Sequence, residues 1–356
     1  MTGSDYSRLR RAAAAVRRVD PAWLARAAAR LDSLTKPPGS LGRLEQIAAR
    51  LCAIEQTLSP RASPRRVVVF AADHGVTEEG VSAYPPAVTA QMVGNFLRGG
   101  AAINALARTT AADLCVVDVG VSGHVEVGAG SASLVSRRIR EGTRNIVDGP
   151  AMTRAELEAA IDAGLEAADA AAADGIAMFV CGEMGIGNTT AAGAITASLA
   201  GVPPADVTGP GTGIDEETHL RKVGVITRAL QVNQPGPDPL DVLRTVGGFE
   251  IAAIVGAYIG AAAHRMAIIG DGFIATAAAL AAARLCPAFV DYWFAGHRSP
   301  EPGHAIQLAL LGQAPLLDLE MRLGEGTGAA LAIHLFDAAA SVMNDMATFE
   351  TAGVSR

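Results

Sequence analysis

The sequence predicts an α/β protein built on a parallel β-sheet. Short apolar or β-branched runs alternate with turns rich in glycine and aspartate and with long alanine-rich segments of helical periodicity. Nearly continuous apolar strands that are separated by helices are typical of parallel sheets buried on both faces. The runs expected to form strands are Val67–Ala71, Leu114–Val119, Ile176–Cys181, Met266–Ile269 and Phe289–Phe294.

Length and composition indicate one large domain with a smaller appendage. The chain has 356 residues, which exceeds the usual size of a single core. Half of the residues are apolar and 18% are charged, a balance far from that of disordered or nucleic-acid-binding chains. The formal net charge of −7 argues against polyanionic partners, although it leaves room for a local basic pocket.

Cysteine usage and hydropathy favour a cytoplasmic protein. The four cysteines form no C-x-x-C pair, so we expect buried, reduced thiols; they are Cys52, Cys115, Cys181 and Cys286. The first 18 residues lack the apolar core of a signal peptide, and no uncharged apolar run reaches the length that spans a membrane. We therefore expect an enzyme or a binding protein with no membrane partner.

The two ends of the chain do not follow the strand–helix alternation. Residues 6–31 have helical periodicity, the Lys36–Ser40 segment with its two prolines ends it, and a further helix is expected over about 41–58. We expect residues 1–60 and 305–356 to pack together as a small helical domain beside a large domain over 61–304. Residues 134–146 fit either an edge strand or an exposed connection.

Glu325 stands out because it lies between two glycines, directly before an alanine-rich apolar segment. Glycines remove side-chain bulk, so a ligand can approach the backbone closely there, and the carboxylate is well placed to take a proton. The alternative is an exposed turn with a glutamate near a helix start, where the helix dipole favours a negative charge.

The Gly182–Thr190 segment follows a predicted strand and opens a predicted helix, with Asn188 or Thr189 as the expected N-cap. Main-chain N–H groups and the helix dipole then point to one spot, which suits a phosphate. The segment is neither a Walker A sequence nor a G-x-G-x-x-G fingerprint. It predicts phosphate or ribose binding, with an ordinary tight turn as the alternative.

A second glycine loop, Gly209–Asp215, precedes a helix expected over 216–230. Its three alternating glycines again expose main-chain donors. Lys222, two turns into that helix, is a candidate to contact a phosphate, although a lone lysine on a helix is more often solvated.

Two further turns follow predicted strands. Asp271, in the turn 270–273, is expected near a ribose hydroxyl, unless this is a simple βα turn. The stiff loop 296–304 holds His297, Arg298 and Ser299, all able to contact phosphate, with a rigid surface connection as the alternative.

The end of the first strand carries Asp73 and His74, but no further ligand follows at the spacing of a metal site, so a metal is not expected. Ser82, Tyr84 and Gln91 instead predict a pocket with an aromatic wall and a few hydrogen-bonding groups. No acidic pair of the kind that binds a Mg²⁺-diphosphate donor precedes a phosphate loop.

Together these segments resemble the nicotinate-nucleotide–dimethylbenzimidazole phosphoribosyltransferase family. The match covers nearly the whole chain and its motifs occur in the family's order: Thr35–Glu45, Ala72–Gly75 with Val81–Pro85, Gly182–Thr190, Gly209–Asp215, His297–His304 and Leu323–Gly328. The resemblance implies a Rossmann-like parallel sheet flanked by helices, a small helical domain formed from both termini, and a homodimer.

The resemblance also implies the roles of individual residues. Glu325 corresponds to the catalytic base and Glu183 to the second active-site carboxylate. The acceptor base is expected at Ser82, Tyr84, Gln91 and Leu323. The mononucleotide is expected at Gly185, Gly187, Asn188, Thr189, Gly211, Thr212, Gly213, Lys222 and Ser299, with Asp271 near the ribose.

The implied reaction suits these residues. The donor, nicotinate mononucleotide, carries a pyridinium that leaves without an acid, a metal or a cofactor, so one carboxylate near neutral pKa suffices to take the proton of the attacking benzimidazole. Two alternatives stay open at this point. One is the same donor with another acceptor (a different benzimidazole, a purine or a phenol), and the other is a mononucleotide sensor without catalysis.

Overall fold

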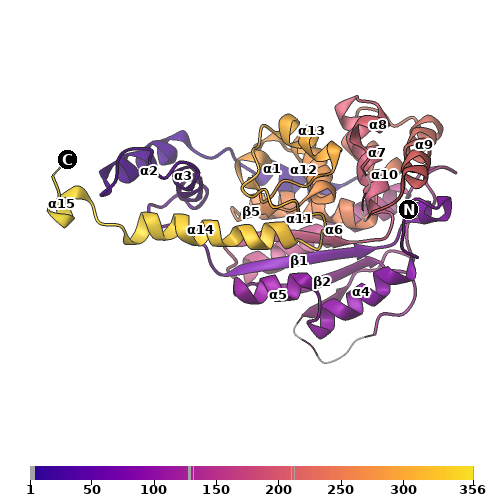
Figure 1. The fold of residues 1–356 in the computed structure, drawn as a ribbon, viewed down its shortest axis with the longest axis horizontal. Helices are drawn as coiled ribbons and strands as arrows, with labels where there is room; N and C mark the ends of the chain where they lie inside the picture. Colours follow the sequence, from indigo (N-terminus) through magenta and orange to yellow (C-terminus); the bar gives the residue numbers. More distant parts are fainter. Residues whose placement is uncertain (1–4, 127–129, 131, 210, 212, 356) are drawn as a thin grey trace.

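The computed structural model describes residues 5–126, 130, 132–209, 211 and 213–355 (Figure 1). Its centre is a parallel sheet of six strands in the order β3-β2-β1-β4-β5-β6. The strands are β1 (Arg65–Ala72), β2 (Asp113–Gly120), β3 (Ser133–Ser136), β4 (Met178–Met184), β5 (Ala267–Gly270) and β6 (Trp293–Ala295). The order reverses between β1 and β4, and in sheets of this Rossmann type ligands bind beyond the carboxyl ends of the strands at that reversal.

Helices cover the sheet and extend beyond it. The helices of the first half are α1 (Ser7–Ala15), α2 (Pro21–Ser33), α3 (Arg43–Glu55), η1 (Gly75–Glu79), α4 (Ala87–Arg98), α5 (Ala102–Thr109) and α6 (Arg154–Ala173). Those of the second half are α7 (Asn188–Ala200), α8 (Pro204–Val207), α9 (Glu216–Asn233), α10 (Pro239–Val246), α11 (Phe249–Ala263), α12 (Phe273–Leu285), η2 (Pro287–Asp291), α13 (Pro302–Leu311), α14 (Thr327–Asp345) and α15 (Phe349–Ala352).

Helix α11 lies at the centre of the core, and all of its residues from Phe249 to Ala262 are buried. It packs closely against α6 because both helices carry a glycine at the crossing. A Cβ at Gly164 of α6 would collide with the main chain at Ala253, and one at Gly256 would collide with the main chain at Ile161. Within the described residues, no helix is long and apolar enough to cross a membrane.

The predicted α/β class with its parallel sheet is confirmed, and four of the five predicted strands lie where the apolar runs are. The prediction for Phe289–Phe294 is wrong in its first half. Pro287 begins the 3₁₀ helix η2, in which Phe289 stacks on Tyr258 of α11 at 5.5 Å, and β6 starts only at Trp293. For residues 134–146 the sequence fits either an edge strand or an exposed connection, and the structure contains both. The segment begins in the edge strand β3 and continues as an irregular connection.

The first predicted helix is two helices, because Asp20 caps a new start at Pro21. Helices α2, α3 and α14 pack together and form an arm that projects from the body together with α15 (Figure 1). In contrast, α1 packs on α11 and α6, and α13 packs on α12. The boundary at residues 60 and 305 stays a prediction, and these contacts tie α1 and α13 to the large body.

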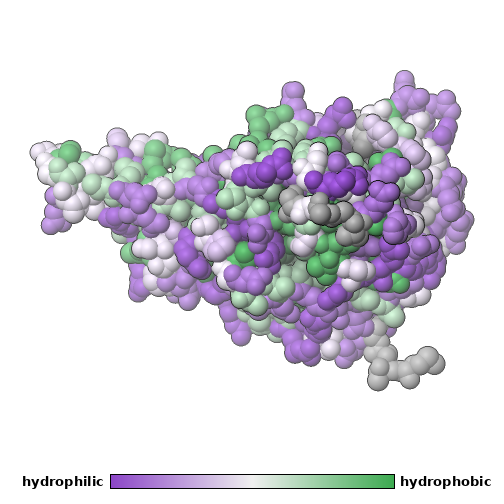
Figure 2. All heavy atoms as spheres, turned by 90° about the horizontal axis from the view of Figure 1, so that it is seen from below, coloured by the Kyte–Doolittle hydropathy of each residue, from purple (hydrophilic) through white to green (hydrophobic). Residues whose placement is uncertain are grey.

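The surface seen from below is a mosaic of hydrophilic and hydrophobic residues (Figure 2). The arm carries both kinds along its length in this view. Helix α14 connects the arm to the sheet, because it contacts α3 at one end and β4 and β5 at the other. The residues just before α14 are therefore held at the carboxyl edge of the strands, where the candidate site lies.

Candidate active site

A pocket opens at the carboxyl ends of β4, β5 and β6. Residues from five segments of the chain line it, including Glu183, Gly185, Asn188, Thr189, Gly211, Asp271, Phe273, His297, Ser299, Glu301, Arg322, Leu323 and Gly324. Eight of the residues singled out from the sequence thus meet in one place, although they come from segments up to 140 residues apart: Glu183, Gly185, Asn188, Thr189, Gly211, Asp271, Ser299 and Leu323. Thr212 lies outside the described residues.

Glu183 at the end of β4 is a buried carboxyl group, and Asn188 Nδ2 donates a hydrogen bond to its Oε2. Burial raises the pKa of Glu183 well above its ordinary value, and the charges of Asp271, Glu250 and Glu325 raise it further. This environment favours the protonated form of the carboxyl group. Glu183 is therefore equipped to donate a hydrogen bond rather than to accept a proton.

Glu325 is also buried, so the exposed-turn alternative for this residue is wrong. It adopts a left-handed conformation with φ of 62°, between Gly324 and Gly326, which both have φ of 86°. Such a conformation costs a non-glycine residue about 1–3 kcal/mol and is concentrated at functional sites. The main-chain N–H of Ile103, in the first turn of α5, donates to Glu325 Oε2 at 3.3 Å.

The pKa of Glu325 is raised by burial and by the charge of Asp271, and the hydrogen bond from Ile103 opposes the rise. The pKa of Glu325 is raised less than that of Glu183, because Glu183 is completely enclosed. A carboxylate with a raised pKa is a stronger base than an ordinary glutamate, which suits a group that takes a proton.

The glycines around the two carboxylates serve close contact between loops. A Cβ at Gly324 would collide with the carboxylate of Glu183, and one at Gly182 would collide with the carbonyl group of Glu325. The sequence predicts that the glycines beside Glu325 let a ligand approach. In the structure they let the β4 loop and the segment before α14 approach each other.

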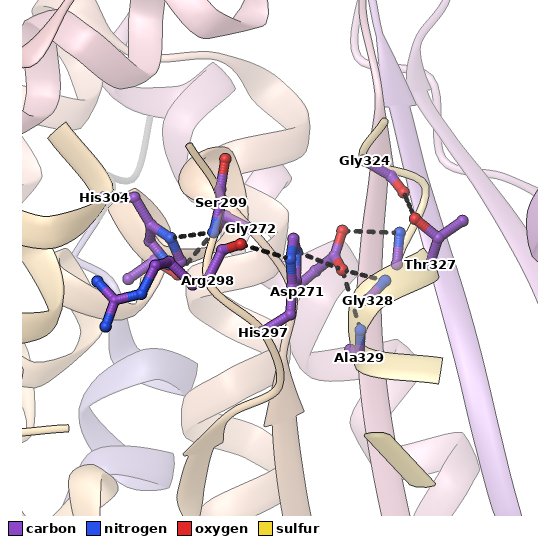
Figure 3. A network of polar contacts seen from close by, with 12 residues as sticks. Asp271, Gly272, His297, Arg298, Ser299, His304, Gly324, Thr327, Gly328 and Ala329 are labelled. Carbon is purple, nitrogen blue, oxygen red and sulfur yellow. Dashed lines mark hydrogen bonds and ion pairs between the residues drawn. The ribbon is translucent and has the colours of Figure 1, made fainter. Parts of the chain in front are cut away.

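Asp271, after β5, holds the start of α14 (Figure 3). Its Oδ2 accepts from the N–H of Gly326 at 3.1 Å, and its Oδ1 accepts from Gly328 at 2.8 Å and Ala329 at 3.0 Å. His297 Nε2 lies 3.4 Å from the same Oδ1. The three main-chain donors make Asp271 a cap of α14, and its side chain also lines the pocket, so the contact with a ribose hydroxyl stays a prediction.

Two histidines order the loop after β6 (Figure 3). Burial tends to lower the pKa of His297, but its hydrogen bond and charge interaction with Asp271 outweigh this and raise it. Burial and the neighbouring His297 lower the pKa of His304 to about 3, so this ring is neutral. His304 Nδ1 accepts from the Ser299 N–H at 2.9 Å and thus fixes Ser299 at the pocket.

Lys222 is buried, so the solvated alternative for this lysine is wrong. Its Nζ donates to Thr189 Oγ1 at 2.8 Å and to the Gly209 carbonyl at 3.4 Å, and burial lowers its pKa to about 8 although the charge of Glu301 opposes this. Glu301 Oε1 in turn accepts from the Gly211 N–H at 2.8 Å. The lysine therefore places a positive charge directly behind the two glycine loops.

The glycine loop after β4 leads into α7 as predicted, but the N-cap is Gly187, with φ of 95°, and not Asn188 or Thr189. Asn188 belongs to the first turn of the helix, where its side chain serves Glu183. Gly187 and Gly213 flank the pocket loops without lining the pocket. The first N–H groups of α7 remain the natural site for an anion.

The predicted acceptor residues are not all brought together. Tyr84 is 51% exposed and Gln91 is exposed, and Ser82 Oγ accepts a hydrogen bond from the Tyr84 N–H. Of the acceptor group, only Leu323 is among the described residues that line the pocket, and it is 58% exposed. In the described single chain the aromatic side of the pocket is Phe273, which sequence reasoning missed.

Asp73 and His74 have partners other than a metal. Asp73 Oδ2 accepts from the Ser122 N–H at 2.7 Å, and His74 Nε2 lies 2.7 Å from Oε1 of Glu250. Among the described residues, no group of three or more histidine, cysteine, aspartate or glutamate side chains is placed to hold a metal ion.

Sequence reasoning also missed Glu250, Glu301 and Arg322. Arg322 lines the pocket and donates to the Gly211 carbonyl at 3.4 Å, so it bridges the segment before Glu325 and the second glycine loop. Two features of the sequence could have indicated two of them: Glu250 follows the glycine pair 247–248 by two residues, and Arg322 lies three residues before Glu325.

Known proteins resemble this chain over almost its full length. Residues 16–354 match the family model described as "Phosphoribosyltransferase". The chain is 52% identical over 342 residues to nicotinate-nucleotide–dimethylbenzimidazole phosphoribosyltransferase of Geobacter metallireducens, covering 96% of both chains, and 53% identical over 348 residues to the protein of the same name from Geobacter sp. strain M21, covering 98% of this chain and 99% of the relative.

Solved structures agree with these sequence matches. The crystal structure of the phosphoribosyltransferase of that name from Thermus thermophilus superposes with a TM-score of 0.89 at 50% identity, covering 95% of this chain and 99% of the other. A second structure from the same organism gives a TM-score of 0.90 at 51% identity, covering 94% and 100%.

Proposed function

We propose that this chain, which belongs to the nicotinate-nucleotide–dimethylbenzimidazole phosphoribosyltransferase family, transfers the 5-phosphoribosyl group of nicotinate mononucleotide to 5,6-dimethylbenzimidazole. The products are α-ribazole 5′-phosphate, for the lower ligand of cobalamin, and nicotinate. The observation that carries the proposal is the pair of buried carboxyl groups, Glu183 and Glu325, whose loops interlock beside a phosphate-type helix N-terminus.

In the proposed reaction Glu325 is the base. One nitrogen of the benzimidazole attacks C1′ of the ribose, the bond from C1′ to the pyridinium nitrogen breaks, and its electron pair returns to the nicotinate ring. The proton on the other benzimidazole nitrogen passes to the Glu325 carboxylate. Attack from the face opposite the leaving nicotinate inverts C1′ and gives the α-riboside. Positioning both substrates in one cleft supplies much of the remaining acceleration.

Glu183 is proposed as the second carboxyl group, in its protonated form. Its raised pKa, which burial dominates and the hydrogen bond from Asn188 only partly opposes, fits a group that donates a hydrogen bond to a substrate rather than one that takes the proton. This division of roles between two carboxyl groups follows from the difference between their surroundings.

The donor phosphate is proposed to lie at the N-terminus of α7, against Gly185, Gly187, Asn188 and Thr189. Lys222 supports that position through Thr189. The second loop, with Gly211 and Gly213, and the ordered Ser299 are proposed to close the site. Arg322 adds a second positive charge at the pocket.

The acceptor is proposed to lie between Leu323 and the segment with Ser82, Tyr84 and Gln91. Tyr84, Leu319 and Leu323 are large hydrophobic residues that are 51–58% exposed in the single chain, which favours their cover by a substrate or by a second copy. We accordingly propose a homodimer, and light scattering on the purified protein measures its mass directly. Separately, we propose a cytoplasmic location, which the four free cysteines support.

The proposed activity is tested by incubating the purified protein with nicotinate mononucleotide and a panel of benzimidazoles, purines and phenols in the presence of EDTA. Mass spectrometry should identify the α-riboside 5′-phosphate of 5,6-dimethylbenzimidazole. If a riboside forms only with another acceptor, that acceptor is the substrate. If the protein binds the donor but forms no product, it is a mononucleotide sensor.

A further inference from the structure

A buried ion pair lies beneath the donor loop, outside the residues that line the pocket. His74, directly after β1, and Glu250, in the first turn of α11, are both almost completely buried, with Nε2 and Oε1 2.7 Å apart. All other residues of α11 up to Ala262 are buried as well, and none of them is charged. A carboxylate in such a helix is costly unless it is paired, and His74 is the partner that offsets this cost.

The His74 ring is in contact with the donor loop. A Cβ at Gly185 would lie 3.3 Å from its Cδ2 and Nε2, and a Cβ at Gly187 would lie 3.2 Å from His74 Cβ. On the other side, a Cβ at Gly248 would collide with the ring and lie 2.7 Å from Glu250 Oε2. The absence of side chains at these three glycines leaves room for the His74–Glu250 pair. The loop that leads into α7 packs against the imidazole ring.

We propose that Glu250 is a positioning residue for the donor: by holding His74 it fixes the Gly185–Thr189 loop, and so fixes the N–H groups of α7 that receive the 5′-phosphate. This inference rests on the proposed function. Burial tends to lower the pKa of His74, but Glu250 and Asp73 outweigh this and raise it, which favours the protonated form of the ring more than in an ordinary histidine.

The test compares Glu250→Ala and Glu250→Gln with a matched control. Calorimetry measures nicotinate mononucleotide and 5,6-dimethylbenzimidazole separately, and steady-state kinetics gives KM and kcat. Glu250→Ala should weaken donor binding about tenfold or more, the scale of a small displacement of binding groups, while acceptor binding stays unchanged. The donor KM should rise more than kcat falls, and Glu250→Gln, which keeps a hydrogen-bonding group of the same size, should restore most of the donor affinity.

Asp169→Asn is the control, because Asp169 pairs with His264 at 2.8 Å at the opposite end of α11. It should leave both affinities unchanged. Should Glu250→Ala fail to fold, His74→Gln replaces it, since the amide can still bond Glu250 but no longer supplies the ring beneath the glycines. It should weaken donor binding in the same way.

Unchanged donor affinity in a folded variant, or equal loss of donor and acceptor affinity, would overturn the positioning role. Failure of the wild-type protein to bind nicotinate mononucleotide would overturn the proposed function, and this inference with it. The two failures are therefore told apart by the wild-type titration alone.

Discussion

The main chain of Glu325 packs directly against Gly182. The end of strand β4 and the segment before α14 therefore leave no space for a side chain at position 182. Only a glycine at 182 permits this contact. The contact sets the distance between the two carboxyl groups of the site, because Glu183 follows Gly182 in the chain and its carboxylate lies against Gly324.

Gly182→Ala should therefore damage both stability and turnover. The added methyl group meets main-chain atoms of Glu325 and Gly326, which cannot rotate away, and overpacking of this kind costs about 1–3 kcal/mol. We expect a lower thermal midpoint and a kcat reduced at least tenfold, because Glu325 must move. Gly224→Ala is the control: nothing lies within 4 Å of its Cβ position in α9, and the change should stabilise the helix by up to about 1 kcal/mol. Equal behaviour of the two variants would contradict the interlocked arrangement.

Replacing each carboxyl group by an amide should separate their roles. Glu325→Gln removes the base and should reduce turnover by about 10²-fold or more with both substrates still bound. Glu183→Gln should lose far less, because a glutamine resembles the protonated carboxyl group that burial already imposes. Single-turnover product formation measures both. If Glu183→Gln is the more damaged variant, the two roles are reversed.

The same raised pKa predicts that Glu183→Gln does not destabilise the fold at neutral pH. In the unfolded chain Glu183 is ionised above its ordinary pKa of 4.5, whereas the raised pKa in the folded protein disfavours the ionised form, so folding at pH 7 carries a free-energy cost at this residue. The amide removes this cost. The midpoint of thermal unfolding at pH 7 should rise relative to wild type, and the gain should vanish below pH 4.5, where the unfolded carboxyl group is protonated too.

Much of this architecture could be predicted from the sequence because it depends on local patterns. The strands are apolar runs, and Glu325 is marked by its neighbouring glycines. The His74–Glu250 pair joins residues 176 positions apart, and nothing near either residue in the chain indicates the other. The exposure of Tyr84 and Gln91 likewise depends on how α4 and the connection before it pack. Asp271 caps a helix that begins far along the chain, a role that no pattern near Asp271 indicates.

The last prediction concerns Lys222 at alkaline pH. Burial lowers its pKa to about 8, and it is protonated below that value and neutral above it. Because it supports the phosphate position through Thr189, kcat/KM for the donor, which reports groups of the free enzyme, should fall as pH rises through about 8, while kcat at saturating donor changes less. Lys222→Arg keeps its charge throughout this range, so the alkaline limb should disappear even though the larger guanidinium binds the donor less well. Thr189→Val removes the hydroxyl that receives the Nζ bond but leaves the titrating amine in place, so it should weaken donor binding and flatten the limb, because the amine then no longer acts through Thr189. An unchanged alkaline limb in Lys222→Arg would assign it to another group and would remove Lys222 from donor binding.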